Sequence, residues 1–456
     1  MLRASASVGI TATGLLLVAQ VQPPAVLMTL EQGDRWRSSV GASASVSADG
    51  RYVAVMSYAR LVPADTNDRA DIYVLDRLSG RITLESLTAD GRRLNGDSGH
   101  PRLSANGRYL VFQTVLGTDA SSPSMADVVY RDRDRDVSTR IRGDTEGSST
   151  EWTGDPAISD DGQLVVFRST VTDLVAGRDE NGSRDDVYEF VPATRALRRI
   201  SVDSHGIQSA TGSSFAPGVS GDGRWVAFTS TADLDGVAGG EPSEGRRSQA
   251  APTAQVFVRD RDLGTTRRVS VGGAGPLDGA SFDAAISRDG RFIAFASDAT
   301  NLTRGDRNRS PDVFVRDMID GSIALVSRAA KGGTANGPSG SPAISADGRF
   351  IAFQSDGSDM ICVRRCETPL EDVNLLADVF RFDRTTGHTD WISALPSGGW
   401  AEESEAPQLD ASGEVVVFTS RHPIDERDTR HDFDMFVRAP AASTLTMRAD
   451  VRRHPR

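Results

Sequence analysis

Short runs of alternating apolar and polar residues occur along most of the chain, and turn residues separate them. Residues 291–295, for example, read Arg-Phe-Ile-Ala-Phe and follow an Asp-Gly pair. Alternation with a period of two predicts a β-strand with one buried face. Asp-Gly supplies the positive φ angles of a tight hairpin turn. Outside the N-terminal segment no helical periodicity exceeds one turn, so the pattern predicts an all-β chain.

This strand–turn–strand pattern is an internal repeat. Each copy has an apolar residue, a short polar turn that ends in Gly, and a second strand that ends in Phe or Val. Repetition along a whole chain is typical of repeat architectures, in which each copy is one structural unit. The copies occupy residues 46–55, 103–112, 158–167, 219–228, 286–295, 344–353 and 409–418.

Two further strands follow each hairpin. In most copies the third strand begins with Asp, as in Asp312-Val313-Phe314-Val315, and the fourth ends near a Ser. A sheet of four antiparallel strands cannot bury both faces by itself, whereas sheets stacked around an axis cover one another. The sequence therefore predicts a seven-bladed β-propeller of four-stranded antiparallel blades over residues 25–450, followed by a tail at 451–456.

Closing the ring requires one blade built from both ends of the chain. Residues 25–31 match the fourth strand at 82–85, so we expect them to complete the blade whose other strands lie within 405–437. Residues 443–447 compete for the same position. We favour closure by the N-terminal strand.

Residues 1–24 have the order of a secretory signal peptide. Arg3 precedes an apolar run at 8–21, and Pro residues follow it. A membrane anchor is the alternative, but Thr11 and Thr13 interrupt the run. Lys331 is the only lysine, a bias typical of GC-rich bacterial genomes. We therefore expect a bacterial periplasmic or secreted protein that does not span the membrane once the signal is removed.

The charge balance bears on the class of partner. The net charge is −12 and the chain has no basic stripe, which argues against nucleic-acid binding. The apolar content of 38% is sufficient for a large core. We expect a soluble monomer.

The repeat resembles the TolB-type, WD-repeat-like family of bacterial propellers. Ser47–Val55, Ser287–Phe295 and Ser345–Phe353 carry the resemblance, followed in each unit by Asp-Val-Phe-Val or a close variant. The resemblance implies an exported propeller that binds other proteins. This chain differs from TolB in its longer loops between strands two and three and in having no separate domain before the propeller, so a role in the Tol–Pal system does not follow.

The loops between strands two and three repeat a pattern of Asp and Asn. Alternating carboxylate and amide oxygens on a tight loop can bind Ca²⁺, but the same side chains also form Asx-turns with their own backbone. We favour turn chemistry, keep Ca²⁺ as the alternative, and expect no required cofactor. The residues are Asp65, Asn67 and Asp71; Asp179, Asn181 and Asp185; Asp306, Asn308 and Asp312; Asp372, Asn374 and Asp378; and, more loosely, Asp428, Asp432 and Asp434.

Catalysis would require a cluster that the repeat does not explain. The six histidines form no metal-binding motif and no nucleophile elbow occurs. The start of the innermost strand offers a ring of residues around the axial channel, which could bind a metal or polar ligand or simply line a wet channel. These residues are Ser43, His100, Asp155, Ala216, Asp283, Ser341 and Ala406.

The sequence thus predicts an exported, non-catalytic scaffold that binds a protein or glycan through its loops. A hydrolase or lyase with its site at the channel mouth is the alternative. Cys362 and Cys366 are the two cysteines, and in an exported protein we expect a local disulfide between them. Free thiols and a metal site are the other interpretations.

Overall fold

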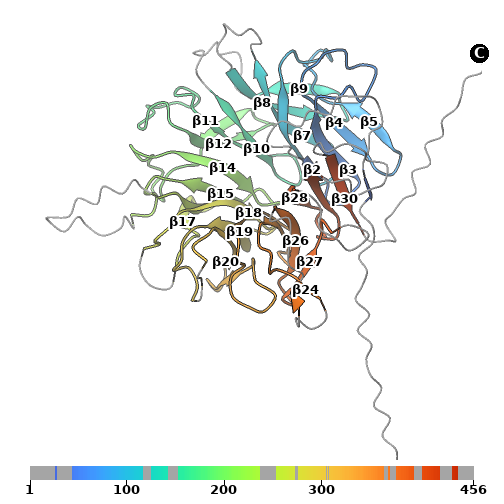
Figure 1. The fold of residues 1–456 in the computed structure, drawn as a ribbon. Coiled ribbons are helices and arrows are strands. Elements are labelled where there is room, and N and C mark those ends of the chain that lie inside the picture. The colour runs from blue at the N-terminus through green and yellow to red at the C-terminus, as the bar shows by residue number, and fades with distance from the viewer. Residues whose placement is uncertain are drawn as a thin grey trace, which may run out of the picture.

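The computed structural model shows an all-β chain. It describes residues 26–27, 44–116, 125–141, 152–236, 253–272, 276–304, 306, 308–363, 368–369, 376–394, 403–421 and 434–439. Within these residues the strands form seven four-stranded antiparallel sheets and one two-stranded ribbon. The seven sheets surround a common axis in chain order (Figure 1). This arrangement confirms the predicted seven-bladed propeller.

The blades are numbered I to VII in chain order, and their strands run from the axis outward. Blades I to III comprise β2 (Ala44–Val46), β3 (Tyr52–Ser57), β4 (Asp71–Asp76), β5 (Arg81–Leu84); β6 (Ser98–Leu103), β7 (Tyr109–Leu116), β8 (Met125–Asp132), β9 (Val137–Arg140); β10 (Thr153–Ile158), β11 (Val165–Ser169), β12 (Asp186–Val191), β13 (Ala196–Arg199).

Blades IV to VII continue in the same order. They comprise β14 (Ser214–Val219), β15 (Trp225–Ser230), β16 (Gln255–Asp260), β17 (Thr265–Arg268); β18 (Ser281–Ile286), β19 (Phe292–Ser297), β20 (Asp312–Asp317), β21 (Ile323–Leu325); β22 (Ser339–Ile344), β23 (Phe350–Ser355), β26 (Asp378–Asp383), β27 (His388–Trp391); β28 (Ser404–Leu409), β29 (Val416–Ser420), β30 (Asp434–Arg438), β1 (Val26–Leu27). The ribbon of β24 (Cys362–Val363) and β25 (Thr368–Pro369) lies between β23 and β26 in sequence.

The turn between strands one and two is locked by its own side chains. In blade I the Ser47 hydroxyl donates to Asp49 Oδ1 (2.6 Å) and accepts the Tyr52 N–H (2.8 Å), while Gly50 has a φ of 69°. The same pair of bonds recurs in blades II to VI. Ser and Asp at this spacing are therefore turn residues, and only Gly accommodates the left-handed backbone without strain.

The arginine after the turn glycine pairs with the carboxylate that ends strand three. In blade I, Arg51 Nη2 lies 2.7 Å from Asp76 Oδ2, and a second bond joins Nε to Oδ1 at 2.9 Å. A two-bond pair of this kind fixes both groups in orientation as well as in position. It ties strand two to strand three in five blades, through Arg51–Asp76, Arg108–Asp132, Arg224–Asp260, Arg291–Asp317 and Arg349–Asp383.

These pairs predict how stability depends on pH. The arginine hydrogen bonds hold the pKa values of Asp76, Asp132, Asp317 and Asp383 below the ordinary range of Asp. A depressed folded-state pKa stabilises the fold above the unfolded-state pKa near 4, and this stabilisation is lost as the pH falls through the folded-state value. We expect the urea midpoint to fall from pH 4 downward, and to fall less steeply in an Asp383→Asn variant. Parallel curves for the two proteins would contradict this assignment.

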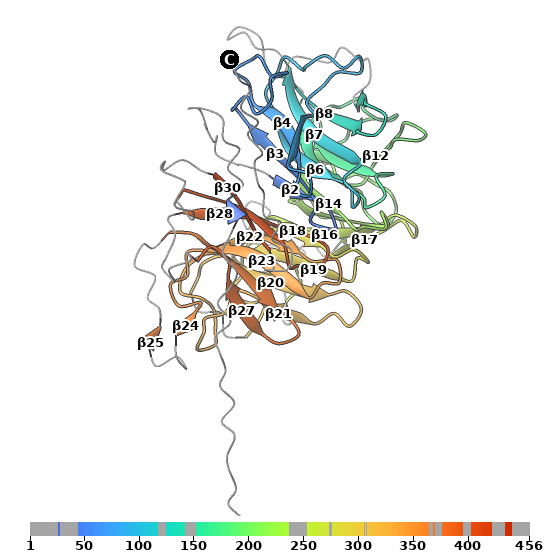
Figure 2. The same ribbon diagram turned by 90° about the vertical axis from the view of Figure 1, so that its right-hand side faces the viewer.

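Neighbouring blades pack face to face through apolar side chains. Ala227 and Val258 of blade IV lie in one buried cluster with Phe295 and Phe314 of blade V, and the sheets stack in this way around the ring (Figure 2). In blades III to VII, the Phe of strand two packs on the aromatic residue of strand three. The ring centroids of Phe353 and Phe380, for example, are 5.9 Å apart. Burial of these aromatic pairs is a main source of stability.

The last blade meets the first. Val53 and Val55 of blade I share a buried cluster with Val415 and Val417 of blade VII. A circuit of backbone hydrogen bonds also joins the strand one–two turns of successive blades and returns to its start, so the ring is closed. Its bonds, each from N–H to carbonyl oxygen, are Ala48–Ala105 (2.8 Å), Ala105–Asp160 (2.9 Å), Asp160–Gly221 (3.0 Å), Asp222–Arg288 (3.4 Å), Arg288–Ala346 (3.0 Å), Ala346–Ala411 (3.0 Å) and Ala411–Ala48 (3.1 Å).

The outer edge of blade VII pairs with the start of the chain. Val26 of β1 pairs with Val437 of β30, and Leu27 pairs with Phe436. Residues 1–25, 28–43 and 440–456 lie outside the described residues, including the signal segment and the competing strand at 443–447. Closure by the N-terminal strand and the limits of the propeller at 25 and 450 therefore remain predictions. Among the residues described, no helix has the length and apolarity needed to cross a membrane.

Candidate functional site

The two ends of the propeller differ in their connections. Short turns join strands one to two and three to four, such as residues 47–51 and 77–80 of blade I, and they lie at one end, the turn face. The longer connections between strands two and three, such as 58–70 and 170–185, lie at the other end together with the links between blades. We call this end the loop face. Each innermost strand starts here, so its first residues surround the mouth of the axial channel.

A β-bulge shapes this mouth. The pairing of strand one with strand two shifts register in blades II to VII. In each of these blades the first unpaired residue of strand one adopts a left-handed backbone conformation. Bulges re-aim side chains near functional sites, and left-handed non-glycine residues store strain. All six of these residues line the channel mouth. They are His100 (φ 52°), Asp155 (48°), Ala216 (49°), Asp283 (53°), Ser341 (48°) and Ala406 (54°).

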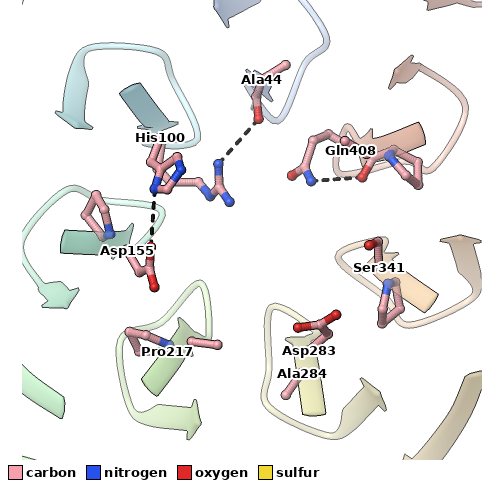
Figure 3. A pocket seen from close by; sticks show the side chains of 14 residues that line it. Ala44, His100, Asp155, Pro217, Asp283, Ala284, Ser341 and Gln408 are labelled. Carbon is pink, nitrogen blue, oxygen red and sulfur yellow. Dashed lines mark hydrogen bonds and ion pairs between the residues drawn. The ribbon is translucent and has the colours of Figure 1, made fainter. Parts of the chain in front are cut away.

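The predicted channel residues are thus brought together wherever the structure describes them; Ser43 lies outside those residues. They surround a cavity of about 560 Å³ (Figure 3). His100 Nδ1 lies 3.2 Å from Asp155 Oδ1, and Arg168 Nε lies 2.7 Å from Asp155 Oδ2. The Arg168 guanidinium also stacks 4.0 Å from the Trp152 ring centroid. One side of the mouth is therefore a connected network of charges.

Sequence reasoning missed the two arginines of this network. Arg102 also lines the cavity, and its Nη1 donates to the Pro101 carbonyl oxygen at 2.9 Å. Arg168 follows Phe167, the Phe of the repeat pattern, near the end of strand two. Their positions in the repeat could have identified them. Arg102 belongs to the innermost strand, and Arg168 lies at the end of the second strand that faces the same mouth. Burial lowers the pKa of Arg102.

The two channel carboxyls have opposite environments. Burial raises the pKa of Asp155, but the hydrogen bond from His100 and the charge of Arg168 outweigh it, so the net shift is downward. Burial also raises the pKa of Asp283, and no charge opposes it. Asp283 makes no side-chain hydrogen bond or ion pair with any described residue. The mouth therefore combines one carboxyl whose charged form is stabilised by its neighbours with another whose charged form is disfavoured by burial.

The turn-face end of the channel is narrower. A cavity of about 150 Å³ lies there, and the Arg288 Nε–Asp160 Oδ2 ion pair (2.6 Å) spans from blade V to blade III. The pair passes over Gly221 of blade IV, where an added Cβ would lie 2.3 Å from Asp160 Oδ2. Access for a ligand is therefore wider from the loop face.

The predicted Asp and Asn loop of blade I forms turns. Asp65 Oδ1 accepts the Asn67 N–H (3.1 Å), and Tyr73 donates its hydroxyl to Asp65 Oδ2 (2.6 Å). Asp71 accepts from Ser86. Arg93 supplies a positive charge, with its Nη1 3.7 Å from Asp65 Oδ1. The arrangement agrees with turn chemistry supported by an ion pair.

Blade III differs from the predicted set by one residue. Asp186, which begins strand three, occupies the position of Asp71, whereas Asp185 lies 3.4 Å from Arg168 near the channel. The spacing from Asp179 to Asp186 is one residue longer than the spacing from Asp65 to Asp71, which explains the shift. Asp179 and Asp186 each lie near Arg199, at 3.3 and 3.4 Å.

The remaining predicted residues fall into two groups. Asp306, Asn308 and Asp312 of blade V are described and are considered further below. Asp378 accepts hydrogen bonds from Trp391 and Ser393, and Asp434 begins β30. Asp372, Asn374, Asp428 and Asp432 lie outside the described residues, as does Cys366, so the disulfide with Cys362 remains a prediction. Within the described part of the chain, no group of three or more His, Cys, Asp or Glu side chains is placed to hold a metal ion.

No protein-family model matches the chain, and no curated protein sequence matches it. The chain is similar to several solved structures at low sequence identity. Oligogalacturonate lyase from Vibrio parahaemolyticus is 11% identical, with 87% of this chain and 88% of that chain covered and a TM-score of 0.48. TolB from Acinetobacter baumannii is 17% identical, with 88% of this chain and 85% of that chain covered and a TM-score of 0.38. The β-propeller domain of the trilobed protease from Pyrococcus furiosus is 10% identical, with 91% of this chain and 93% of that chain covered and a TM-score of 0.48.

These structures include a TolB, a lyase and a protease domain. At such identities the similarity concerns the fold alone, because one propeller fold carries many activities. The function has to be argued from the residues of the channel mouth and the loops around it.

Proposed function

We propose that this protein is an exported, non-catalytic, TolB-like β-propeller that binds a protein or glycan partner through its loop face. The observation that carries the proposal is the concentration of long connections on the face that holds the wider channel mouth. The 560 Å³ cavity there has an arginine–histidine–aspartate network on one side and Asp283 and Ser341 on another. Variable loops around a rigid scaffold are the usual location of binding surfaces.

The chemistry of the mouth supports recognition of a polar group. His100 and Arg168 already contact Asp155 before any partner arrives, so little reorganisation is needed on binding. Asp283 and Ser341 offer a hydrogen-bond donor or acceptor to an inserted side chain or sugar hydroxyl. The left-handed bulges direct these side chains toward the mouth.

An Asp283→Arg variant tests the proposal. It places a long cation in the mouth, whereas an Ile319→Arg control alters a 75% exposed residue on the turn face. A partner is first identified by cross-linking in the native envelope or secreted fraction, and its Kd is then measured with the purified proteins. We expect Asp283→Arg to weaken binding at least about tenfold, or roughly 1.4 kcal/mol, and the control to bind as the unmodified protein does. Equal affinity of the two variants would place the interface elsewhere.

A hydrolase or lyase at the channel mouth is the second candidate. Its support is the opposite shift of the pKa values of Asp155 and Asp283, because two carboxyls with separated pKa values can serve as base and acid. This candidate predicts that His100→Ala or Asp283→Ala abolishes a turnover measured on glycan and peptide panels while the melting temperature stays unchanged. Absence of any turnover by the unmodified protein on these panels would leave the binding function.

A further inference from the structure

A buried carboxylate begins strand three in several blades. The Ser that follows strand four donates its hydroxyl to one oxygen of this carboxylate. The carboxylate requires a further donor or a nearby cation, because a buried charge without compensation is costly. The pairs are Asp71–Ser86, Asp186–Ser201, Asp312–Ser327 and Asp378–Ser393.

One position on strand four carries an arginine in three blades. It pairs in register with the residue two positions after the buried Asp of strand three, or after Gln255 in blade IV. In blades II, III and IV it is Arg140, Arg199 and Arg268. Arg140 pairs with Asp127, Arg199 lies near Asp186, and Arg268 pairs with Asp235 of the same loop region. The repeat therefore has a built-in position for a cation beside its strand two–three loop.

Blades I and VI fill the same need differently. In blade VI the position is Trp391, whose indole N–H donates to Asp378 Oδ1 at 3.1 Å. In blade I it is Leu84, and the cation comes from Arg93. Burial raises the pKa of Asp71 to about 6, and the charge of Arg93 opposes this shift. Each of these five blades thus has a donor or a cation at the loop.

Blade V is the exception. Its strand-four position is Leu325. Asp312 is fully buried, and its Oδ2 has no hydrogen-bond partner, which also holds for Asp71 Oδ2 of blade I. Blade V differs in that no described cation lies beside its two carboxylates. Both carboxylate oxygens of Asp306 are inaccessible to solvent and also without a hydrogen-bond partner. The charges of Asp306 and Asp359 act on Asp312, and the charge of Asp278 acts on Asp306. The described charged neighbours of the two carboxyls are therefore negative.

The environment of these carboxyls fits a missing cation. Burial, followed by the nearby charge of Asp306, raises the pKa of Asp312 to about 7. Burial likewise raises the pKa of Asp306; the Asn308 main-chain N–H offsets this in part without reaching hydrogen-bond geometry. Asn308 itself is held in place, because its side-chain NH₂ donates to the Ala335 carbonyl oxygen (2.8 Å) and its Oδ1 accepts the Ser310 N–H (3.0 Å).

We propose that Asp306, Asn308 and Asp312 form a binding site for one Ca²⁺ ion. The donors are oxygens of two carboxylates and one amide, which select a hard cation. Two carboxylates match a divalent charge, and water completes the six to eight ligands that Ca²⁺ takes. Mg²⁺ requires near-ideal octahedral geometry and shorter bonds, which a site on an irregular loop satisfies less well. The ion occupies the role that arginine has in blades II to IV.

Isothermal titration of CaCl₂ into chelator-treated protein tests this site. We expect one Ca²⁺ per chain and a higher melting temperature with CaCl₂ than with chelator. Asp306→Asn abolishes both effects, whereas Asp65→Asn, the equivalent change in blade I beside Arg93, leaves them intact. Absence of Ca²⁺ binding by the unmodified protein, or equal loss in the two variants, would overturn the proposal.

A second variant keeps the test independent of folding defects. Leu325→Arg installs the guanidinium that blades II to IV carry at this position. We expect the variant to melt in chelator at or above the temperature of the unmodified protein and to bind no Ca²⁺. Binding by Leu325→Arg as tight as that of the unmodified protein would contradict the site, and equal binding of MgCl₂ would overturn its assignment to calcium. The outcome does not depend on the proposed partner binding.

Discussion

Gly290→Ala is expected to lower the free energy of unfolding by about 3 kcal/mol. This value is the sum of the cost of an alanine in the left-handed conformation and the cost of an overpacked contact. Gly290 lies in the strand one–two turn of blade V with a φ of 73°. An added Cβ would lie 2.2 Å from Cδ1 of Trp225, the aromatic residue that follows the turn of blade IV. The ring belongs to the neighbouring blade and packs, partly buried, against the inter-blade cluster, so the ring must shift to relieve the overlap. Urea denaturation gives the change directly.

Gly223→Ala is the matched control. Gly223 occupies the same position in blade IV with the same φ of 73°, but an added Cβ would lie 3.6 Å from Leu164 Cδ2, an ordinary contact. Only the backbone term remains, about 1 kcal/mol. The difference between the two variants therefore measures the aromatic contact alone. Equal losses would show that the turn conformation, and not inter-blade packing, makes glycine necessary.

Glu85→Ala is expected to cost about 3 kcal/mol, because breaking a buried ion pair leaves an uncompensated charge. Glu85 ends blade I and reaches two arginines of blade II. Its Oε2 lies 2.7 Å from Arg131 Nε and its Oε1 lies 2.9 Å from Arg133 Nε. The Glu85 and Arg131 side chains are only 5% and 4% exposed. Arg131 keeps its contacts with Asp136 and Ser138, which limits the loss.

Two further variants separate charge from packing at this junction. Glu85→Gln retains the size and one acceptor, so its urea midpoint should lie between those of the unmodified protein and Glu85→Ala. Glu414→Ala, at an exposed turn position of blade VII, should leave the midpoint unchanged. An unaltered midpoint for Glu85→Ala would mean that the network adds no net stability across the blade I–II interface.

Much of the molecule is readable from the repeat. The period-two runs and turn glycines identify the strands, and their sevenfold recurrence identifies the propeller. Aligning the copies also identified the channel ring, because equivalent positions of equivalent strands face the same axis. His100, Asp155, Asp283 and Ser341 line the mouth as that alignment predicts. The left-handed bulge that presents them was not predicted, since its residues include His, Asp, Ala and Ser rather than Gly.

The sequence by itself determined the strands, the turns, the number of blades and the positions that face the axis, because these depend on contacts between residues close in the chain or equivalent in the repeat. Only the tertiary structure showed that Asp186 rather than Asp185 joins the loop cluster of blade III. It alone separated Asp306 and Asp312, which have no cation among the described residues beside them, from Asp65 and Asp71, which have Arg93. Compensation of a buried charge depends on groups brought together from separate strands and loops, and a local pattern of Asp and Asn does not contain that information.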